Sequence, residues 1–146
     1  MKDEVPKTFP PALRACWIKL NSVFAKKLQN LGLTPDQYSV LRWLHEIKDK
    51  PICQKDLASL LFTDPNNIAE LVKRMEKNNL IKHTSPANDK RKKIIFPTKL
   101  GTKKWLHAKN IAFSLEQKAF SSLSRDEIEH LTYLLKAISE YLNKDA

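Results

Sequence analysis

Four consecutive cations, Lys90 to Lys93, lie in a short polar stretch between two apolar segments of the chain. Lysine and arginine at this density suit a polyanion such as a nucleic-acid backbone, whose phosphates they neutralise. Upstream, Asn66 and Asn67 begin a segment that also carries Lys73 and Arg74. Asparagine pairs with adenine edges, while lysine and arginine suit guanine or phosphate. The residue types therefore predict a surface that binds nucleic acid.

Other reactive side chains are not spaced for a second kind of chemistry. A zinc site needs ligands at short, regular spacings such as C-x-x-C or H-x-x-x-H. The four histidines lack that spacing: His45, His83, His107 and His130. Cys16 and Cys53 are far apart, which favours inert, buried thiols in a reduced intracellular protein. With no nucleophile elbow and no acid–base pair, we expect no enzyme activity, no cofactor and no metal.

The charge distribution supports a polyanion partner. The chain has 146 residues and a net charge of +10, and residues 51–109 alone carry 13 Lys/Arg against 5 Asp/Glu. Basic residues that merely solvate a surface would be spread more evenly. Glycine occurs only as Gly32 and Gly101. That excludes the glycine-rich phosphate loops of nucleotide-binding folds and disfavours an all-β fold.

Length and hydropathy favour one cytoplasmic domain. A chain of 146 residues with 42% hydrophobic residues can bury a proper core. The first residues, MKDEVPKTFPP, are polar and proline-rich, so we expect no secretory signal. Nowhere do 18 apolar residues run together, so we expect no membrane span.

Apolar residues at three- or four-residue spacing predict a mostly helical fold. A long helix over 10–31 ends at Gly32, and Thr34-Pro35-Asp36-Gln37 reads as a capping box that opens the next helix. Long helices also follow over 98–120, capped by Thr98, and over 125–142, opened by the box Ser124 to Glu127. The apolar stripes of the three long helices exceed what one small lobe buries, which predicts a homodimer.

Between the long helices, the order of elements is that of a winged helix-turn-helix. Ile52-Cys53 reads as a short extended piece, 54–61 as a two-turn helix, and 65–78 as a helix with Asp64 as its N-cap. Asn79 suits the left-handed position that ends this helix. Two β-branched segments, 80–84 and 93–97, then predict a hairpin whose tip is the cationic run.

The short helix would brace the helix over 65–78, so that the first half of that longer helix projects into a major groove. The buried face of the helix over 65–78 is formed by Ile68, Leu71, Val72 and Met75. Ile94 to Phe96 would anchor the hairpin on the core, while its tip reaches along the DNA and places a cation in the minor groove. The residues expected at the DNA are Gln54, Thr63, Asn66, Asn67, Glu70, Lys73, Arg74, Lys77, Asp89, Lys90, Arg91, Lys92 and Lys93.

In these segments the chain resembles the multiple-antibiotic-resistance regulator (MarR) family of bacterial transcription factors. The matching pieces are Gly32-Leu33-Thr34, Gln54 to Ala58, and Leu71 to Ile81, which closes the recognition helix. The wing signature D-x-R is present as Asp89-Lys90-Arg91, and T-x-x-G as Thr98 to Gly101. The resemblance covers nearly the whole chain.

The resemblance implies a single domain over 1–146, with dimerisation helices over 10–31 and 98–142 and a DNA-binding lobe over 34–97. It implies a homodimer on a pseudo-palindromic promoter site, usually as a repressor, with Arg91 in the minor groove and Asp89 as its partner. Three positions depart from the family pattern. Asn79 replaces the usual glycine, Pro97 replaces a leucine and would end the strand one residue early, and Asp64-Pro65 replaces small polar residues near phosphate.

The resemblance also implies a small phenolic or oxidant effector, held between the dimerisation helices and the DNA-binding lobe. Trp17, Tyr38, Trp43 and His45 would line such a pocket, although residues at their helical spacing more often belong to the core. A winged-helix module for protein–protein or RNA contacts is the alternative function. RNA binding usually adds exposed stacking aromatics. Phe62 and Phe96 are expected in the core, which disfavours RNA.

Overall fold

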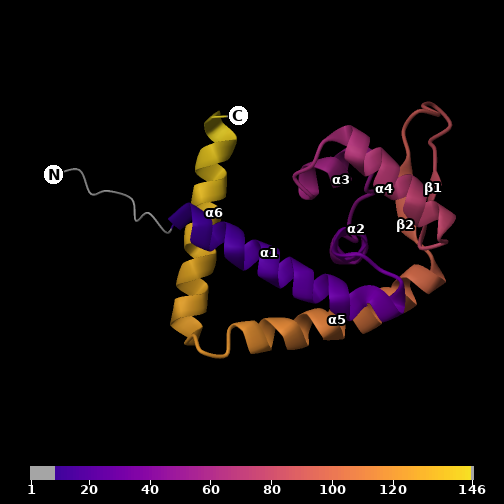
Figure 1. The fold of residues 1–146 in the computed structure, drawn as a ribbon. Helices are drawn as coiled ribbons and strands as arrows, with labels where there is room; N and C mark the ends of the chain where they lie inside the picture. The colour runs from indigo at the N-terminus through magenta and orange to yellow at the C-terminus, as the bar shows by residue number, and fades with distance from the viewer. Residues whose placement is uncertain (1–8, 146) are drawn as a thin grey trace. The chain divides into compact units, whose positions relative to one another are not determined.

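A computed structural model describes residues 9–145 of the chain. The polar segment 1–8, in which we expected no secretory signal, lies outside the described residues. The described elements, in chain order, are α1 (Phe9–Leu28), the 3₁₀ turn η1 (Gln29–Leu31), α2 (Pro35–Glu46), α3 (Gln54–Leu60), α4 (Pro65–Lys77), β1 (Ile81–Thr84), β2 (Ile94–Pro97), α5 (Lys99–Ala119) and α6 (Arg125–Asp145) (Figure 1). A mostly helical fold with one small hairpin is confirmed.

The chain divides after Ile111 into two compact units. The first holds a continuous apolar core to which α1, α2, α3, α4, the hairpin and the first part of α5 contribute side chains. Its fully buried large side chains are Leu28, Val40, Leu41, Leu57, Ile68, Val72, Met75 and Leu80. The single-domain organisation over 1–146 stays a prediction.

Predicted caps fix where three helices of the first unit begin. Thr34 and Gln37 exchange backbone-to-side-chain hydrogen bonds of 3.2 Å, which completes the capping box of α2. Asp64 Oδ1 accepts the Asn67 amide at 2.9 Å at the start of α4. Thr98 Oγ1 accepts the Gly101 amide at 2.9 Å at the start of α5. Each of these helices begins where a side chain replaces the missing intrahelical acceptor.

α5 starts in close contact with the end of α4. The Thr98 hydroxyl donates to the carbonyls of Asn79 and Leu80, and the Thr98 amide also donates to Leu80 O. A Cβ at position 101 would overlap the Leu80 carbonyl. Glycine is therefore required at Gly101 by close approach, and this contact joins the two helices.

The hairpin is antiparallel and gains a third, one-residue strand. Its register pairs Ile81 with Pro97 and Thr84 with Ile94, so the strand continues through Pro97. The expectation that proline would end the strand one residue early is therefore wrong. Sheets tolerate proline where its missing N–H would have no ladder partner. The predicted extended piece is confirmed, since Cys53 bridges Ile94 and the Ile95 amide donates to Ile52 O at 2.8 Å.

Four burial expectations are wrong. Phe62 was expected in the core, yet its side chain is 81% exposed. Phe96 alternates with the buried Ile95 along β2 and is therefore 38% exposed. Cys16 is exposed and Cys53 half-buried, so neither is the fully buried thiol that was expected.

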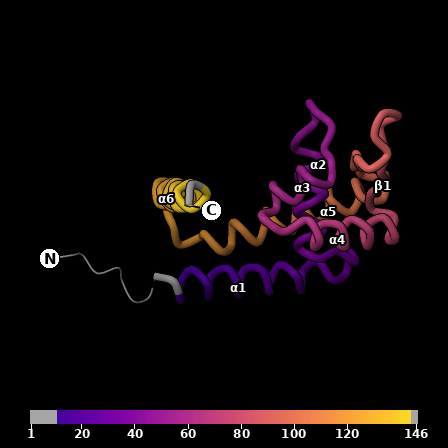
Figure 2. The backbone as a smooth tube through the Cα atoms, turned by 90° about the horizontal axis from the view of Figure 1, so that it is seen from above, coloured from indigo at the N-terminus to yellow at the C-terminus, as the bar shows by residue number. Residues whose placement is uncertain are grey.

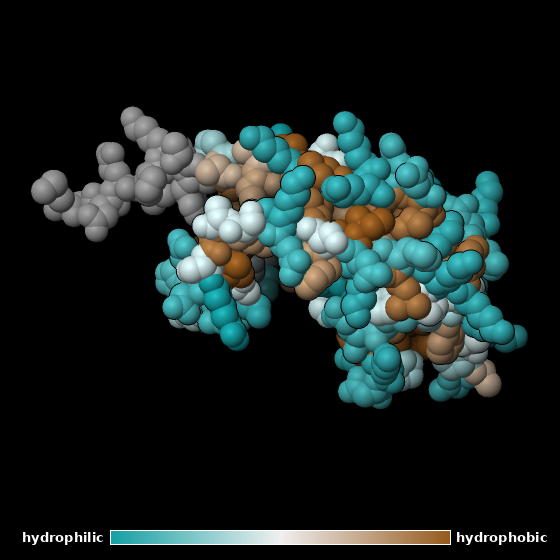
Figure 3. All heavy atoms as spheres, turned by 90° about the horizontal axis from the view of Figure 1, so that it is seen from below, coloured by the Kyte–Doolittle hydropathy of each residue, from teal (hydrophilic) through white to brown (hydrophobic). Residues whose placement is uncertain are grey.

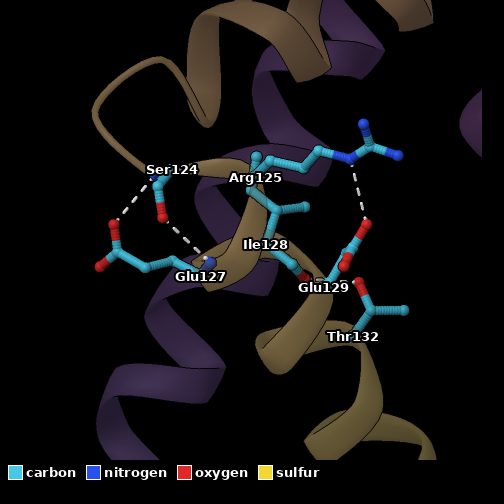
Figure 4. A network of polar contacts seen from close by, with 6 residues as sticks. All are labelled: Ser124, Arg125, Glu127, Ile128, Glu129 and Thr132. Carbon is cyan, nitrogen blue, oxygen red and sulfur yellow. Dashed lines mark hydrogen bonds and ion pairs between the residues drawn. The ribbon is translucent and has the colours of Figure 1, made fainter.

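α6 begins with the second predicted capping box (Figure 4). Ser124 Oγ accepts the Glu127 amide at 3.1 Å, and Glu127 accepts the Ser124 amide at 2.9 Å. Arg125 and Glu129 pair at 3.2 Å on the same exposed turn. The Ser124 amide donor holds the pKa of the Glu127 carboxyl below its usual range.

Large apolar side chains remain exposed on the long helices. α1 exposes Leu13, Trp17, Ile18 and Val23. α6 exposes Leu131, Tyr133, Leu134, Leu135, Ile138, Tyr141 and Leu142. Figure 3 shows brown apolar patches that reach the surface of one face among hydrophilic side chains. In the described part of the chain, no helix has the length and apolarity to cross a membrane.

Candidate nucleic-acid interface

The α4 helix separates a buried face from a polar one. Ile68, Val72 and Met75 are 0%, 1% and 0% exposed, and Leu71 at their edge is half-buried. These anchors fix the rotation of α4 against α3 and β1, which it contacts (Figure 2). The six predicted contact residues of α4 all lie on the exposed face: Asn66, Asn67, Glu70, Lys73, Arg74 and Lys77.

The first turn of α4 treats its two asparagines differently. Asn67 Nδ2 donates to Asp64 Oδ2 at 3.0 Å and lies 3.4 Å from Thr63 Oγ1. Among the described residues, no hydrogen-bond partner holds the Asn66 side chain. Asn67 therefore helps to fix the helix start, while Asn66 keeps its full donor and acceptor set for a base edge. From the sequence, both asparagines were expected at the DNA.

The wing tip presents its cations to solvent. Lys90, Arg91, Lys92 and Lys93 are all exposed. Asp89 Oδ1 accepts the Arg91 amide at 3.0 Å, and Asp89 O accepts the Lys92 amide at 3.3 Å. Asp89 was expected to orient the Arg91 side chain. Within residues 9–145 its contact is with the Arg91 backbone, so Asp89 shapes the loop and leaves the guanidinium free.

A groove of about 570 Å³ is lined by residues of the wing and of the start of α3. Five predicted contact residues line it: Gln54, Asp89, Arg91, Lys92 and Lys93. Cys53, Lys55 and Pro65 complete the lining and were not predicted. Lys55 was missed because the pairing of Cys53 with Ile94, which is distant in sequence, brings the start of α3 to the hairpin. Lys55 therefore adds a fourth cation to the three that the wing supplies to this groove, Arg91, Lys92 and Lys93.

A second hollow of about 410 Å³ runs along α4. Four predicted contact residues line it: Thr63, Asn67, Glu70 and Arg74. Asp36, Leu61 and Leu71 form the rest of its lining. Asn66, Lys73, Lys77 and Lys90 line neither depression and are exposed around them. The predicted set thus divides into a helix cluster on and just before α4 (Thr63, Asn66, Asn67, Glu70, Lys73, Arg74 and Lys77) and a wing cluster (Gln54 and residues 89–93).

Backbone hydrogen bonds hold the wing against the brace helix. The Gln54 amide donates to Lys93 O at 3.1 Å, which ties the first residue of α3 to the wing. The Gln54 side-chain Oε1 is buried, with no hydrogen-bond partner among the described residues. On the other side of the hairpin, His83 Nδ1 lies 2.8 Å from Glu76 Oε1 and links β1 to α4.

A carboxylate at the start of α3 is held ionised mainly by hydrogen bonds from Cys53. Asp56 Oδ2 accepts the Cys53 amide at 2.9 Å. This hydrogen bond, a side-chain contact with Cys53 and the charges of Lys50 and Lys92 hold the pKa of Asp56 below its ordinary value, against a smaller opposing effect of burial. The carboxylate therefore stays ionised beside the wing and offsets part of its positive charge.

The four aromatic effector candidates have different surroundings. Tyr38 meets Phe24 edge-on at 5.1 Å between ring centroids. His45 stacks on Trp105 at 4.1 Å and contacts Leu41 O and Thr102 Oγ1 through its two ring nitrogens. Trp43 carries the Arg42 guanidinium on its ring, and Trp17 is 64% exposed. Packing contacts thus occupy Tyr38 and His45.

The described residues contain no cluster of three or more His, Cys, Asp or Glu side chains that could hold a metal ion. The interface is built instead from amides, lysines and arginines. Those donors suit base edges and phosphates.

Comparison with known proteins yields relatives along most of the chain. The sequence profile of the MarR family matches residues 33–93. The transcriptional regulator HosA of Escherichia coli is 32% identical over 105 residues, which are 71% of this chain and 76% of HosA. A probable transcriptional regulator from Pseudomonas aeruginosa is 27% identical, with a TM-score of 0.79 over 92% of this chain and 99% of that one.

A likeness of fold alone extends to a DNA complex. The structure of the S. aureus MepR–DNA complex matches with a TM-score of 0.84 at 24% identity, and the match covers 95% of this chain and 99% of the MepR chain.

Proposed function

This chain belongs to the MarR family of transcriptional regulators, and from that premise we propose that it binds a pseudo-palindromic promoter site as a homodimer. The N-terminal half of α4 enters the major groove, and the wing tip reaches the neighbouring minor groove with Arg91. Regulation follows from binding rather than from catalysis. Promoter DNA lies in the bacterial cytoplasm, which is where we place the protein.

One observation carries this proposal: two separate polar clusters occur on one compact unit. The helix cluster supplies the Asn66 amide, free among the described residues, and the Arg74 guanidinium, which suit base edges. The wing cluster supplies cations around a groove, which suits phosphates and the negative potential of a narrow minor groove. A surface that only solvates the fold has no need of a cationic groove beside an amide-bearing helix start.

Two further findings support the assignment. MepR, a protein of the same fold, has been crystallised in complex with DNA. Residues 51–109, which contain α3, α4 and the wing, hold a net charge of +8 out of +10. Phosphate neutralisation supplies most of the affinity in such interfaces.

The exposed apolar side chains of α6 support the homodimer. Seven large apolar side chains of this one helix are exposed, and a patch of that kind on a folded chain marks an interaction surface. We assign the patch, with the exposed residues of α1, to a second copy of the chain. A sedimentation experiment at micromolar concentration that finds only a 16.9 kDa species would overturn the dimer and the symmetric site.

Repression is the mode of regulation that we propose, with release by a small aromatic or phenolic effector as its control. The aromatic candidates give that effector little support, because Tyr38 and His45 pack against Phe24 and Trp105. An effector would have to displace these contacts or bind elsewhere.

The test is a fluorescence-anisotropy titration with the duplex that adjoins the protein's own gene. A scrambled duplex, single-stranded RNA and heparin are the competitors. We expect preference for the promoter duplex and a fall of log K with log salt of slope about 5 or more, at roughly 0.9 per phosphate contact. A flat salt dependence, or preference for RNA, would overturn the proposal in favour of a protein- or RNA-binding module.

A further inference from the structure

Three helical segments of this chain end in the same backbone motif. One residue shortly after each of η1, α3 and α4 has a positive φ: 67° at Gly32, directly after η1, and 52° at Phe62 and 59° at Asn79, each two residues past its helix. In each case the following amide donates back five residues, as in Thr63 N to Ala58 O at 3.1 Å. This is the Schellman arrangement, whose left-handed residue is usually glycine and sometimes asparagine.

Phe62 is the exception among the three. A β-carbon makes the left-handed region unfavourable, and phenylalanine has no short polar group to offset that cost. Burial would explain its choice, but the ring is 81% exposed, the highest value among the exposed large apolar side chains of the described residues. The residues that follow Gly32 and Asn79 are leucines, Leu33 and Leu80, and both are buried. The residue that follows Phe62, Thr63, is only half-buried. Neither conformation nor packing accounts for phenylalanine here.

Phe62 is close in sequence to the candidate interface. It lies two residues before Asp64, the N-cap of α4, and next to Thr63, which lines the hollow along that helix. Between residues 33 and 93, Phe62 is the one exposed large apolar residue. The others lie on α1, α5, α6 and β2. Phe62 therefore does not belong to the helices whose exposed apolar side chains we assign to the second copy.

We propose that Phe62 is an apolar DNA contact, and that its ring packs against a thymine methyl group or a deoxyribose where α4 enters the duplex. Phenylalanine recognises the thymine methyl group in major grooves. A single exposed ring that shortly precedes a polar, cationic helix fits a nucleotide better than a protein, because protein interfaces bury clusters of apolar residues. This inference rests on the proposed function, and it adds an apolar contact to an interface otherwise built from polar groups.

The decisive variant is Phe62→Gly, because glycine suits the left-handed backbone and removes only the ring. We expect its melting temperature to equal or exceed that of the parent. We expect its affinity for the promoter duplex to fall by about tenfold or more, which corresponds to losing the burial of a phenyl ring. The salt slope should not change, because no charge is lost.

Two matched variants separate the ring from the backbone. Asn79→Gly makes the same exchange at the other end of α4, and it should raise the melting temperature without weakening DNA binding. Phe62→Asn keeps a residue that tolerates positive φ and should lose affinity as Phe62→Gly does. Equal binding by the parent and both Phe62 variants would overturn the inference. So would a Phe62→Gly protein that sediments as a monomer where the parent is a dimer.

A duplex with deoxyuridine in place of thymidine identifies the contacted group. If the ring packs on a methyl group, the parent should lose affinity on that duplex while Phe62→Gly should not. If it packs on deoxyribose, both proteins should bind the two duplexes alike and the tenfold difference between them should persist. Failure of the parent to bind any duplex would reject the proposed function itself. A parent that binds normally beside an unaffected Phe62→Gly would reject the inference alone.

Discussion

The recognition helix and the wing tip are held in place very differently. α4 is anchored by three fully buried side chains and fixed at both ends, by Asp64 at its start and by the left-handed Asn79 after its end. The wing tip has no buried side chain between residues 87 and 93, and a few turn hydrogen bonds around Asp89 define it. A rigid helix suits base recognition, where geometry decides, and an exposed cationic loop suits phosphate, where charge decides.

The two regions are nevertheless joined at their bases. Strand β2 is held by the Ile95 amide on Ile52 O, and β1 meets α4 through His83 and Glu76. The hairpin returns to the end of α4 at Leu80, whose carbonyl accepts from Thr98. A change at this junction should therefore disturb helix and wing together, whereas a change at either tip should affect one function only.

Gly101→Ala should have the largest effect, because it breaks the junction. The new Cβ would overlap the Leu80 carbonyl, so the start of α5 and the end of α4 must move apart. We expect a loss of about 3 kcal/mol or more in the free energy of unfolding, at the upper end for overpacking. Urea denaturation followed by circular dichroism measures it.

Gly32→Ala is the control: its Cβ would meet only the flexible end of Lys104, at 3.3 Å from Nζ, so its penalty comes mainly from positive φ and should be about 1–2 kcal/mol. If the two variants are equally stable, close approach at Leu80 does not set the junction.

Arg91→Ala tests the wing alone. The guanidinium is exposed and unpaired among the described residues, so folding should not change. We expect a loss of about 1.5–3 kcal/mol in operator binding, the range for hydrogen bonds to charged groups. The salt slope should also fall by about 0.9. Discrimination for A/T-rich flanks should decrease, because a narrow minor groove attracts arginine.

Arg125→Ala on α6 is the matched control for Arg91→Ala. Its arginine is also exposed and lies outside the basic stretch, where it pairs with Glu129. It should bind DNA like the parent. A folded Arg91→Ala protein with parental affinity would mean that the wing is a solvated basic loop.

Local chemistry explains which features were predictable from the sequence. The caps Thr34, Asp64, Thr98 and Ser124 were found because each acts on a residue three positions away. Asn79 was found because asparagine is a known substitute for glycine in the left-handed position. The division of α4 into buried and exposed faces follows from helical spacing.

The features that were missed depend on conformation or on neighbours distant in sequence. Phe62 was expected in the core because it is apolar, and no local signal reveals a left-handed phenylalanine. Lys55 joins the wing cluster only because strand pairing brings α3 to the hairpin. The involvement of Asn67 with Asp64 is local, but the same amide suits either a cap or a base edge, and its hydrogen bond to Asp64 Oδ2 shows that it serves the cap.

The two asparagines of α4 allow a sharper comparison within the helix. Asn66→Ala should relax preference at one base pair of the half-site by about 1–3 kcal/mol, with little change in salt slope or stability. Asn67→Ala should instead lower the melting temperature slightly, because its Nδ2 donor to Asp64 is lost. Binding to singly substituted duplexes, together with thermal melts, measures both. If Asn67→Ala instead relaxed base preference and Asn66→Ala did not, the Asn67 side chain would have to release Asp64 in order to contact a base.

The smallest effect concerns acid and compares the wing with α6. Asp56 and Glu127 both accept a backbone amide at a helix start, and both have a pKa below the ordinary value. A depressed pKa contributes stability above the unfolded pKa, which is 3.8 for Asp56, and that contribution disappears as pH falls through the folded value. The melting temperature of Asp56→Asn should therefore fall less than that of the parent between about pH 5 and 3.

Lys50 and Lys92 attract the Asp56 carboxylate, whereas the Ser124 hydrogen bonds alone lower the pKa of Glu127. Salt screens attraction between exposed charges more than it weakens a hydrogen bond. Added salt should consequently shrink the difference between parent and Asp56→Asn and leave that between parent and Glu127→Gln nearly unchanged. Equal salt responses would mean that the wing exerts no charge effect on α3.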